Sequence, residues 1–228
     1  MNTDKHSVED PEQIIESALD RTESYIEKNF KTLIIAVGAI IVITGSYFGY
    51  RSFIESPRIE NASAAAFVAE QYFQQDSFAL ALNGNDYFEG FIEIADSYSS
   101  TPIGNMANHY AGICYLKLGD FNNAASYLKR YNRVEGEASA VINAQNIGLL
   151  GDIAVEQGDN AAAIKQYALA CEINNDFTAP MYLKKLGLMY ELEGNNAKAL
   201  EAYNKISVLY PSSLEGRDIE KFIGRIEK

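Results

Sequence analysis

The segment GLMYELEGNNAKALEAYNKI, residues 187–206, has the pattern of two short helices packed against each other. Its small residue, turn glycine, alanine, aromatic residue and last apolar residue are Gly187, Gly194, Ala199, Tyr203 and Ile206. Small residues allow two helices to approach closely, and a glycine permits the turn between them. Large side chains then fill the remaining space. The segment therefore predicts a helical hairpin.

The same pattern occurs twice more, in GICYLKLGDFNNAASYLKRY (112–131) and GDIAVEQGDNAAAIKQYALA (151–170). The three turn glycines are 39 and 36 residues apart, at Gly119, Gly158 and Gly194. Such self-similarity indicates a repeat architecture. Residues 105–212 resemble three tetratricopeptide repeats, which implies a right-handed α-solenoid. The spacing exceeds the usual 34 residues of that repeat, so we expect extended connecting loops.

The segments on either side of the repeats also have helical periodicity. Residues 51–104 predict a linker and a degenerate helical pair, in which the apolar stretch 78–84 is either a helix end or an exposed loop. Residues 213–228 predict a last helix whose charged outer face suits the cap of a solenoid. The segment between Phe67 and Phe91 is rich in aromatic residues, and the sequence assigns it no role.

Residues 32–50 form a stretch of 19 uncharged residues between Lys31 and Arg51. As a helix it is about 28 Å long, close to the thickness of the hydrocarbon core of a bilayer. A cleaved signal peptide is disfavoured, because the stretch starts late, follows an acidic tail and lacks an Ala-x-Ala site. We interpret it as an uncleaved transmembrane anchor; the alternative is a buried core helix. The fold class is thus all-α, a single N-terminal transmembrane helix followed by the solenoid.

The residues around the anchor predict its orientation and contacts. Three basic residues precede it within about 15 positions and two follow it, which favours a cytoplasmic tail (residues 1–31) and a C-terminal domain across the membrane. The tail predicts an amphipathic helix starting at Asp10 and Pro11, either for docking on a membrane protein or for lying at the membrane surface. A neighbouring transmembrane helix can approach the anchor closely at its glycines, Gly38, Gly45 and Gly49.

Composition and motifs argue against several classes of function. A net charge of −12 disfavours nucleic acid as a partner, because the phosphate backbone attracts basic surfaces. The two histidines, His6 and His109, and the two cysteines, Cys114 and Cys171, form no metal-binding or redox motif. No catalytic motif is recognisable. We expect no enzyme activity, no cofactor and no metal site, and interpret both cysteines as buried thiols.

A binding surface follows from the resemblance to the tetratricopeptide repeat. In that family the inner face of the solenoid is lined by the first helix of each pair. The corresponding positions here are Met106, His109, Ile113 and Leu116, then Gln145, Gly148, Asp152 and Val155, then Met181, Lys184, Leu188 and Glu191. This mostly apolar, methionine-containing set predicts a groove for a polypeptide segment. The alternative is half-buried surface without a partner.

The whole chain resembles the YfgM family of bacteria, ancillary subunits of the SecYEG translocon. Residues 27–31 leading into the anchor, followed by repeats, carry this resemblance. It implies an inner-membrane protein with a periplasmic domain. It also implies three kinds of partner, namely translocon subunits, a membrane-anchored periplasmic prolyl isomerase-like chaperone, and nascent or translocating polypeptides. Two alternatives are an envelope scaffold unrelated to translocation and a cytoplasm-facing adaptor of inverted topology.

Overall fold

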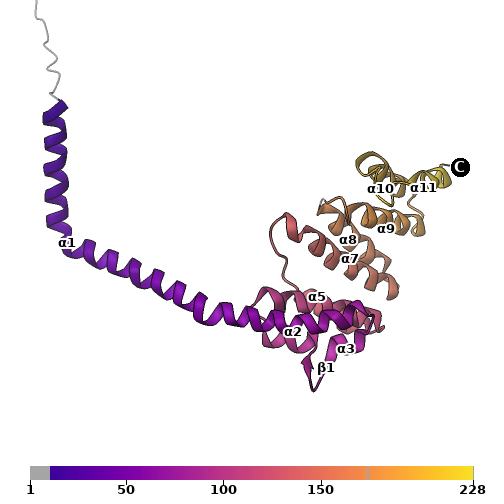
Figure 1. The fold of residues 1–228 in the computed structure, drawn as a ribbon. Coiled ribbons are helices and arrows are strands. Elements are labelled where there is room, and N and C mark those ends of the chain that lie inside the picture. The colour runs from indigo at the N-terminus through magenta and orange to yellow at the C-terminus, as the bar shows by residue number, and fades with distance from the viewer. Residues whose placement is uncertain (1–10, 174, 228) are drawn as a thin grey trace, which may run out of the picture. The chain divides into compact units, whose positions relative to one another are not determined.

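The computed structural model describes residues 11–173 and 175–227, with side chains from residue 19 onward, and the chain divides after Pro57 into two compact units. In the first unit, helix α1 (Pro11–Tyr50) continues through a π-helical turn, η1 (Arg51–Glu55), into the start of α2 (Ser56–Gln74) (Figure 1). The tail and the apolar stretch thus form one continuous helix. The expected N-cap, Asp10, lies outside the described residues.

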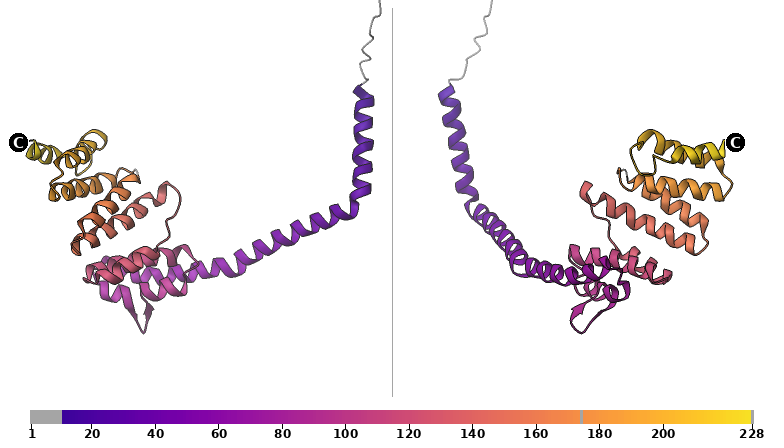
Figure 2. Two further views of the ribbon diagram at one scale, coloured as in Figure 1. Left: turned by 180° about the vertical axis from the view of Figure 1, so that it is seen from behind. Right: turned by 45° about the vertical axis from the view of Figure 1, so that its right-hand side comes forward.

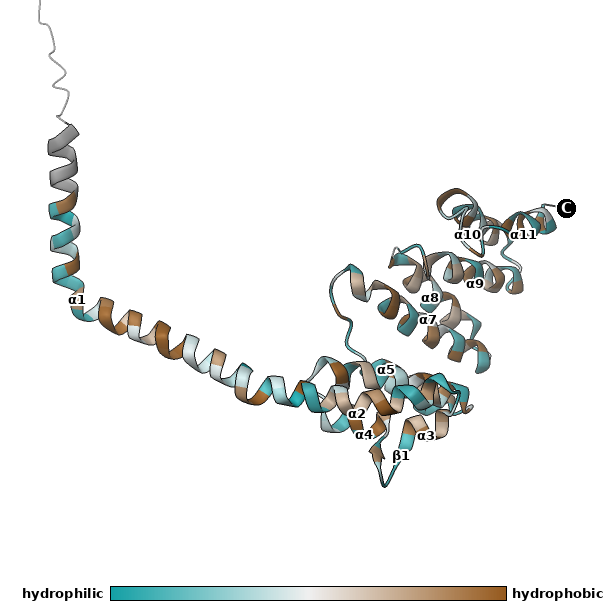
Figure 3. Cartoon of the chain, in the orientation of Figure 1, coloured by the Kyte–Doolittle hydropathy of each residue, from teal (hydrophilic) through white to brown (hydrophobic). Residues whose placement is uncertain are grey.

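Helix α1 exposes the apolar stretch along its second half, which is coloured brown in Figure 3. Ile35 and Ile43 are 71% and 69% exposed. In the described chain one helix is long and apolar enough to cross a membrane, and none of its most apolar window is buried. A buried core helix, the alternative left open by the sequence, does not fit this exposure.

The first helical pair of the second unit differs from the expected all-α arrangement. Helix α2 is followed by a short helix α3 (Phe78–Asn83), a two-stranded antiparallel hairpin and helix α4 (Phe91–Ser97). The hairpin pairs β1 (Gly84–Asn85) with β2 (Phe88–Glu89). Gly84 adopts φ +66°, and a Cβ there would lie 2.4 Å from the backbone nitrogen of Gly90. Only glycines permit this close backbone approach, which allows the hairpin to form. The hairpin divides the expected second helix of the pair into α3 and α4.

Most of the aromatic segment that the sequence left unassigned forms the core of this pair. Phe91 is fully buried and stacks on Tyr110 of the next helix with ring centroids 5.0 Å apart. Phe73 meets the same tyrosine edge-on at 5.1 Å. Tyr72 stacks on Phe88 of the hairpin at 4.8 Å. These rings therefore join the irregular pair to the first regular repeat.

Three regular helical pairs follow, stacked one on another in both views of Figure 2. Their helices are α5 (Pro102–Lys117) and α6 (Phe121–Arg130), α7 (Ala140–Glu156) and α8 (Asn160–Glu172), α9 (Ala179–Leu192) and α10 (Asn196–Leu209). The predicted close approach within each pair is confirmed. A Cβ at Gly151 would lie 2.6 Å from the ring of Tyr167, and one at Gly187 would lie 2.2 Å from that of Tyr203.

The turns of the pairs also match the sequence pattern. Gly119, Gly158 and Gly194 adopt φ of +80°, +74° and +73°, which side chains with a Cβ rarely adopt. The additional residues between the first and second repeats form a loop that ends in a 3₁₀ turn, η2 (Glu137–Ser139). After α10 the chain makes turns before the last helix, α11 (Ile219–Ile226), so the capping helix is shorter than residues 213–228.

Candidate protein-binding surface

Residues predicted from the first helices of two repeats come together around one cavity. Ile113 and Leu116 of α5, with Asp152 and Val155 of α7, line a space of about 470 Å³. Its other lining residues, which the sequence analysis did not assign to a groove, are Lys117, Phe121, Leu149, Glu156 and Tyr167. Most of these side chains are apolar or aromatic, so the cavity can accept an apolar side chain of a partner.

The apolar members of the predicted set differ in their access to solvent. Ile113 is 9% exposed and belongs largely to the core, whereas Val155 and Leu188 are 39% and 40% exposed. Met106, Leu116 and Met181 are half-buried. The accessible apolar positions therefore lie on all three first helices, α5, α7 and α9.

His109 is a structural residue rather than an accessible one. It is 1% exposed, and its Nδ1 lies 2.9 Å from Oδ1 of Asn146. Asn146 donates its amide to the carbonyl of Leu128, so its oxygen faces the histidine, which must carry the proton on Nδ1. The Gln145 side chain lies 3.3 Å from Nε2. Burial lowers the pKa of His109, while these hydrogen bonds oppose the shift.

Asp152 is also engaged within the protein, where it joins three helices. Its Oδ1 accepts a hydrogen bond of 2.6 Å from the hydroxyl of Tyr167 on α8. Both carboxylate oxygens pair with Nζ of Lys185 on α9, at 2.6 and 2.8 Å. Burial and the neighbouring Asp152 carboxylate raise the pKa of Tyr167. Asp152 therefore ties the second repeat to the third.

Glu191 repeats this arrangement one repeat further along. It accepts a hydrogen bond from the hydroxyl of Tyr203 on α10 and pairs with Arg225 of α11 at 2.6 and 2.8 Å. Lys184 lies over the ring of Phe222, also on α11, at 4.5 Å from the ring centroid. The charged positions expected to face a partner thus contact the next element of the solenoid.

Gly148, which the pattern also placed on the inner face, has a packing role. A Cβ at this position would lie 2.0 Å from Cε1 of Tyr182, because that ring of α9 packs directly on the backbone of α7. The sequence signal for this contact was the small residue itself. Its partner was not recognisable, because Tyr182 lies in the next repeat and outside the aligned segments.

The glycines of the apolar helix remain open in the structure. A Cβ at Gly38, Gly45 or Gly49 would meet no other atom within 4 Å. The described part of the first unit therefore places no protein against this face. Contact with another transmembrane helix at these glycines stays a prediction.

The described residues contain no group of three or more His, Cys, Asp or Glu side chains arranged to hold a metal ion. Cys114 is buried and Cys171 half-buried, and both are free thiols. Burial raises the pKa of each thiol to about 12, which keeps both protonated and unreactive near neutral pH.

Comparison with known proteins agrees with this geometry. Models of the tetratricopeptide repeat match residues 107–133, 144–177 and 185–213. These parts of the chain therefore contain tetratricopeptide repeats, and domains of this kind generally bind other proteins. These matches do not show the YfgM family specifically.

Solved structures extend the agreement to the fold. A crystal structure of the MamA protein superposes with a TM-score of 0.54 at 19% identity, covering 74% of this chain and 83% of that one. A second structure of MamA gives 0.49 at 18% identity, over 70% and 92% of the two chains. At this identity the first likeness shows the fold alone. No curated protein sequence matches the chain.

Proposed function

We propose that the protein is a membrane-anchored interaction protein whose repeats bind an apolar polypeptide segment of a partner. The observation that carries this proposal is the cavity between α5 and α7, with accessible apolar side chains continuing onto α9. Of the charged residues that line it, Asp152 is held by Lys185 within the solenoid. A partner therefore meets mainly apolar surface, and an exposed apolar patch usually serves a contact.

The anchor is supported by the length, composition and exposure of the apolar helix. Its large side chains have no protein partner within the described unit, and water is an unfavourable environment for so many of them. Insertion into a bilayer removes this cost. The proposed orientation, with residues 1–31 in the cytoplasm, rests on the charge bias alone.

Binding rather than catalysis is part of the proposal. The cavity brings together Asp152, Glu156 and Lys117, but Asp152 is already paired with Lys185. The imidazole of His109 is buried and faces two side-chain amides. The charged groups at the cavity thus form no recognisable acid–base pair.

The finer proposal is that this protein joins the SecYEG translocon and a periplasmic prolyl isomerase-like chaperone, and assists newly translocated polypeptides. It rests on the family resemblance of the tail, anchor and repeats. Affinity purification of the full-length chain in mild detergent tests it. Sec subunits should co-purify under the translocon proposal, whereas their absence alongside other envelope proteins would favour the scaffold alternative.

Mutation of the accessible apolar positions tests the binding surface itself. We expect Val155→Asp combined with Leu188→Asp to abolish crosslinks formed by a photoreactive amino acid at Leu116 in the full-length, membrane-inserted protein. The matched control is Leu192→Asp, which places the same charge at a position of α9 that is 67% exposed and outside the cavity lining. Helical circular dichroism should be unchanged in both. Equal crosslinking in the double variant and the control would reject the surface.

A further inference from the structure

The negative charge of the second unit is concentrated in its first elements. Residues 59–116, from α2 to near the end of α5, contain seven acidic residues and no lysine or arginine. Residues 117–228 contain 15 acidic and 13 basic residues and are nearly balanced. The acidic residues of the first stretch are Glu60, Glu70, Asp76, Asp86, Glu89, Glu93 and Asp96. A positive charge that neutralises these carboxylates must come from another part of the chain or from a partner.

Two arginines from outside the stretch reach it, and they leave most of its charge unpaired. Arg130 pairs with Asp96 at 2.5 Å. Arg58 donates to the backbone carbonyl of Ser97 at 2.7 Å rather than to a carboxylate. In the described part of the chain the other six carboxylates make no ion pair. This stretch of the chain is therefore electrostatically complementary to a basic partner.

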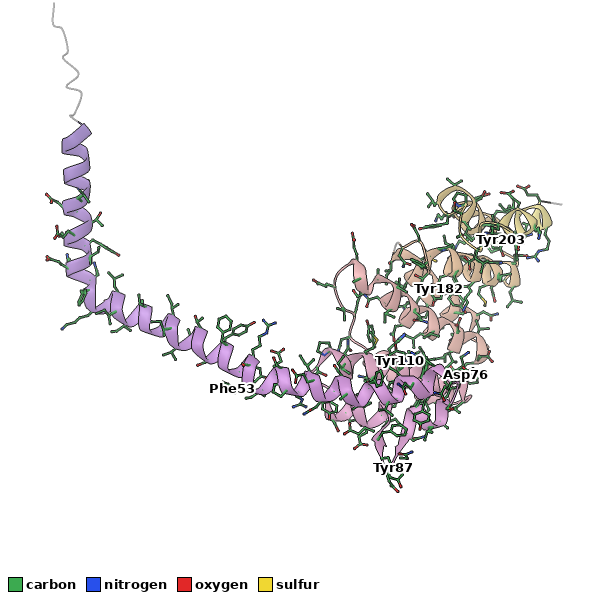
Figure 4. All side chains as sticks on the ribbon, in the orientation of Figure 1. Phe53, Asp76, Tyr87, Tyr110, Tyr182 and Tyr203 are labelled. Carbon is green, nitrogen blue, oxygen red and sulfur yellow. The ribbon has the colours of Figure 1, made fainter. Side chains whose placement is uncertain are left out.

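The hairpin presents an aromatic side chain from this acidic region. Tyr87 is 95% exposed and, in Figure 4, lies at the tip of the hairpin and points away from the helices. Its neighbour Asp86 is exposed as well. An exposed tyrosine beside a free carboxylate combines a π face with an anion, the two groups that a guanidinium ion prefers.

The conformation of the tip is fixed before any partner binds. The side chain of Asn85 accepts a hydrogen bond of 2.9 Å from the backbone nitrogen of Tyr87. At the base, Gly84 and Gly90 are in close backbone contact, and Phe88 stacks on Tyr72 of α2. Holding the backbone that carries Tyr87 lowers the conformational entropy lost on binding.

We propose that the hairpin tip, Asp86 and Tyr87, is a second docking point that binds an arginine-containing basic segment of a partner protein. The guanidinium group stacks on the Tyr87 ring and donates hydrogen bonds to the Asp86 carboxylate, while the net negative charge of residues 59–116 attracts the segment. This contact is separate from the cavity between α5 and α7. The same negative charge disfavours an anionic lipid surface as the occupant.

Peptide binding to the full-length chain in bilayer discs of zwitterionic lipid tests the proposal. The probes are two fluorescent peptides of equal length, one with four arginines and one with four lysines in a Gly-Ser background. We expect tighter binding of the arginine peptide, and a two- to five-fold weakening by Tyr87→Ala, the size of an exposed cation–π contact. Tyr87→Phe should keep the affinity, and Asp86→Asn should weaken it.

The control variant is Phe177→Ala, which removes an aromatic side chain that is 82% exposed in another repeat. It should bind both peptides like the unmodified protein. Equal affinity for the two peptides, together with no effect of Tyr87→Ala, would overturn the proposal, because it would show general attraction to acidic surface only. The variants of the apolar surface, Val155→Asp and Leu188→Asp, should not change arginine-peptide binding, so each proposal can fail without the other.

Discussion

At the scale of single residues, this fold depends on glycines, which have no side chain, as much as on the large side chains that pack against them. Gly112, Gly151 and Gly187 each receive a large side chain from the second helix of their own pair. Gly148 receives Tyr182 from the following repeat. Close packing leaves no room for even one methyl group at these positions. The glycines therefore set the distances between helices.

Gly187→Ala should destabilise the protein by about 1–3 kcal/mol, the usual cost of overpacking a core. The reason is that its Cβ would lie 2.2 Å from the ring of the buried Tyr203. Gly224→Ala is the control, since a Cβ at this helical position of α11 meets nothing within 4 Å. Urea unfolding of both variants measures the difference. Equal stability would contradict the packing argument.

His109 should make the stability depend on pH. Burial lowers its pKa below the usual 6.5, so in the interval between the two values the unfolded chain binds a proton and the folded chain does not. The free energy of unfolding is therefore unaffected by His109 above about pH 6.5 and decreases as the pH falls through that interval.

Urea unfolding at pH 7.5 and 5.5 measures this effect. The expected result is a smaller loss of stability on acidification for His109→Gln than for the unmodified protein, since glutamine does not titrate. Identical losses in the two proteins would show that groups other than His109 account for the pH dependence. The carboxyls of Glu70 and Glu89 act in the opposite sense, because a raised pKa lets the folded chain bind protons before the unfolded chain does. Burial raises the pKa of both carboxyls.

At the scale of helices, polar contacts join each first helix to the next. His109 of α5 meets Asn146 of α7, Asp152 of α7 pairs with Lys185 of α9, and Glu191 of α9 pairs with Arg225 of α11. Helix α11 thus takes the place that a first helix of another repeat would occupy. Its Ile219 and Ile223 are buried against the third repeat, which closes the apolar end of the stack.

Lys185→Met should lower the free energy of unfolding by about 1 kcal/mol, because it leaves the half-buried carboxylate of Asp152 without its cation. Lys165→Met is a matched control on α8, where the lysine is exposed and makes no ion pair in the described residues. Chemical denaturation measures the free energy of unfolding of both variants. If Lys165→Met lowered the free energy of unfolding as much as Lys185→Met, the ion pair between Asp152 and Lys185 would not stabilise the contact between the repeats.

At the scale of the whole molecule, a long exposed apolar helix and a repeat domain with its own cores occur in one chain. Under the proposed function, lipid surrounds the apolar helix of the first unit, whereas water surrounds the second unit. Under the same proposal, the net negative charge of the repeat domain favours its solubility beside the membrane.

Protease added to spheroplasts should digest the repeat domain, while N-terminal sequencing should still find the tail. Both results follow from an uncleaved anchor with a cytoplasmic N-terminus. The control is permeabilised cells, in which the tail becomes accessible as well. A protected repeat domain would indicate the inverted topology, and a mature protein starting near Arg51 would indicate a cleaved signal peptide.

The sequence by itself determined the features that depend on local spacing. Glycines, alanines and aromatic residues at fixed intervals predicted the three helical pairs and their turns, because the small and large residues that meet within each pair lie in a segment of 20 consecutive residues. The uninterrupted apolar stretch predicted the long helix in the same way. The irregular first pair lacked such a pattern, and its hairpin at Gly84 was missed because two strands of two residues leave no detectable alternation.

Only the tertiary structure decided which predicted surface residues are free to meet a partner. His109, Asp152 and Glu191 occupy positions that face a groove in the repeat family, yet here they contact Asn146, Lys185 and Arg225, 33 to 37 residues away. A repeat pattern specifies contacts within one pair, whereas the contacts between pairs depend on loop lengths and on the stacking of whole repeats. The same stacking created the cavity between α5 and α7, whose lining comes from two repeats at once.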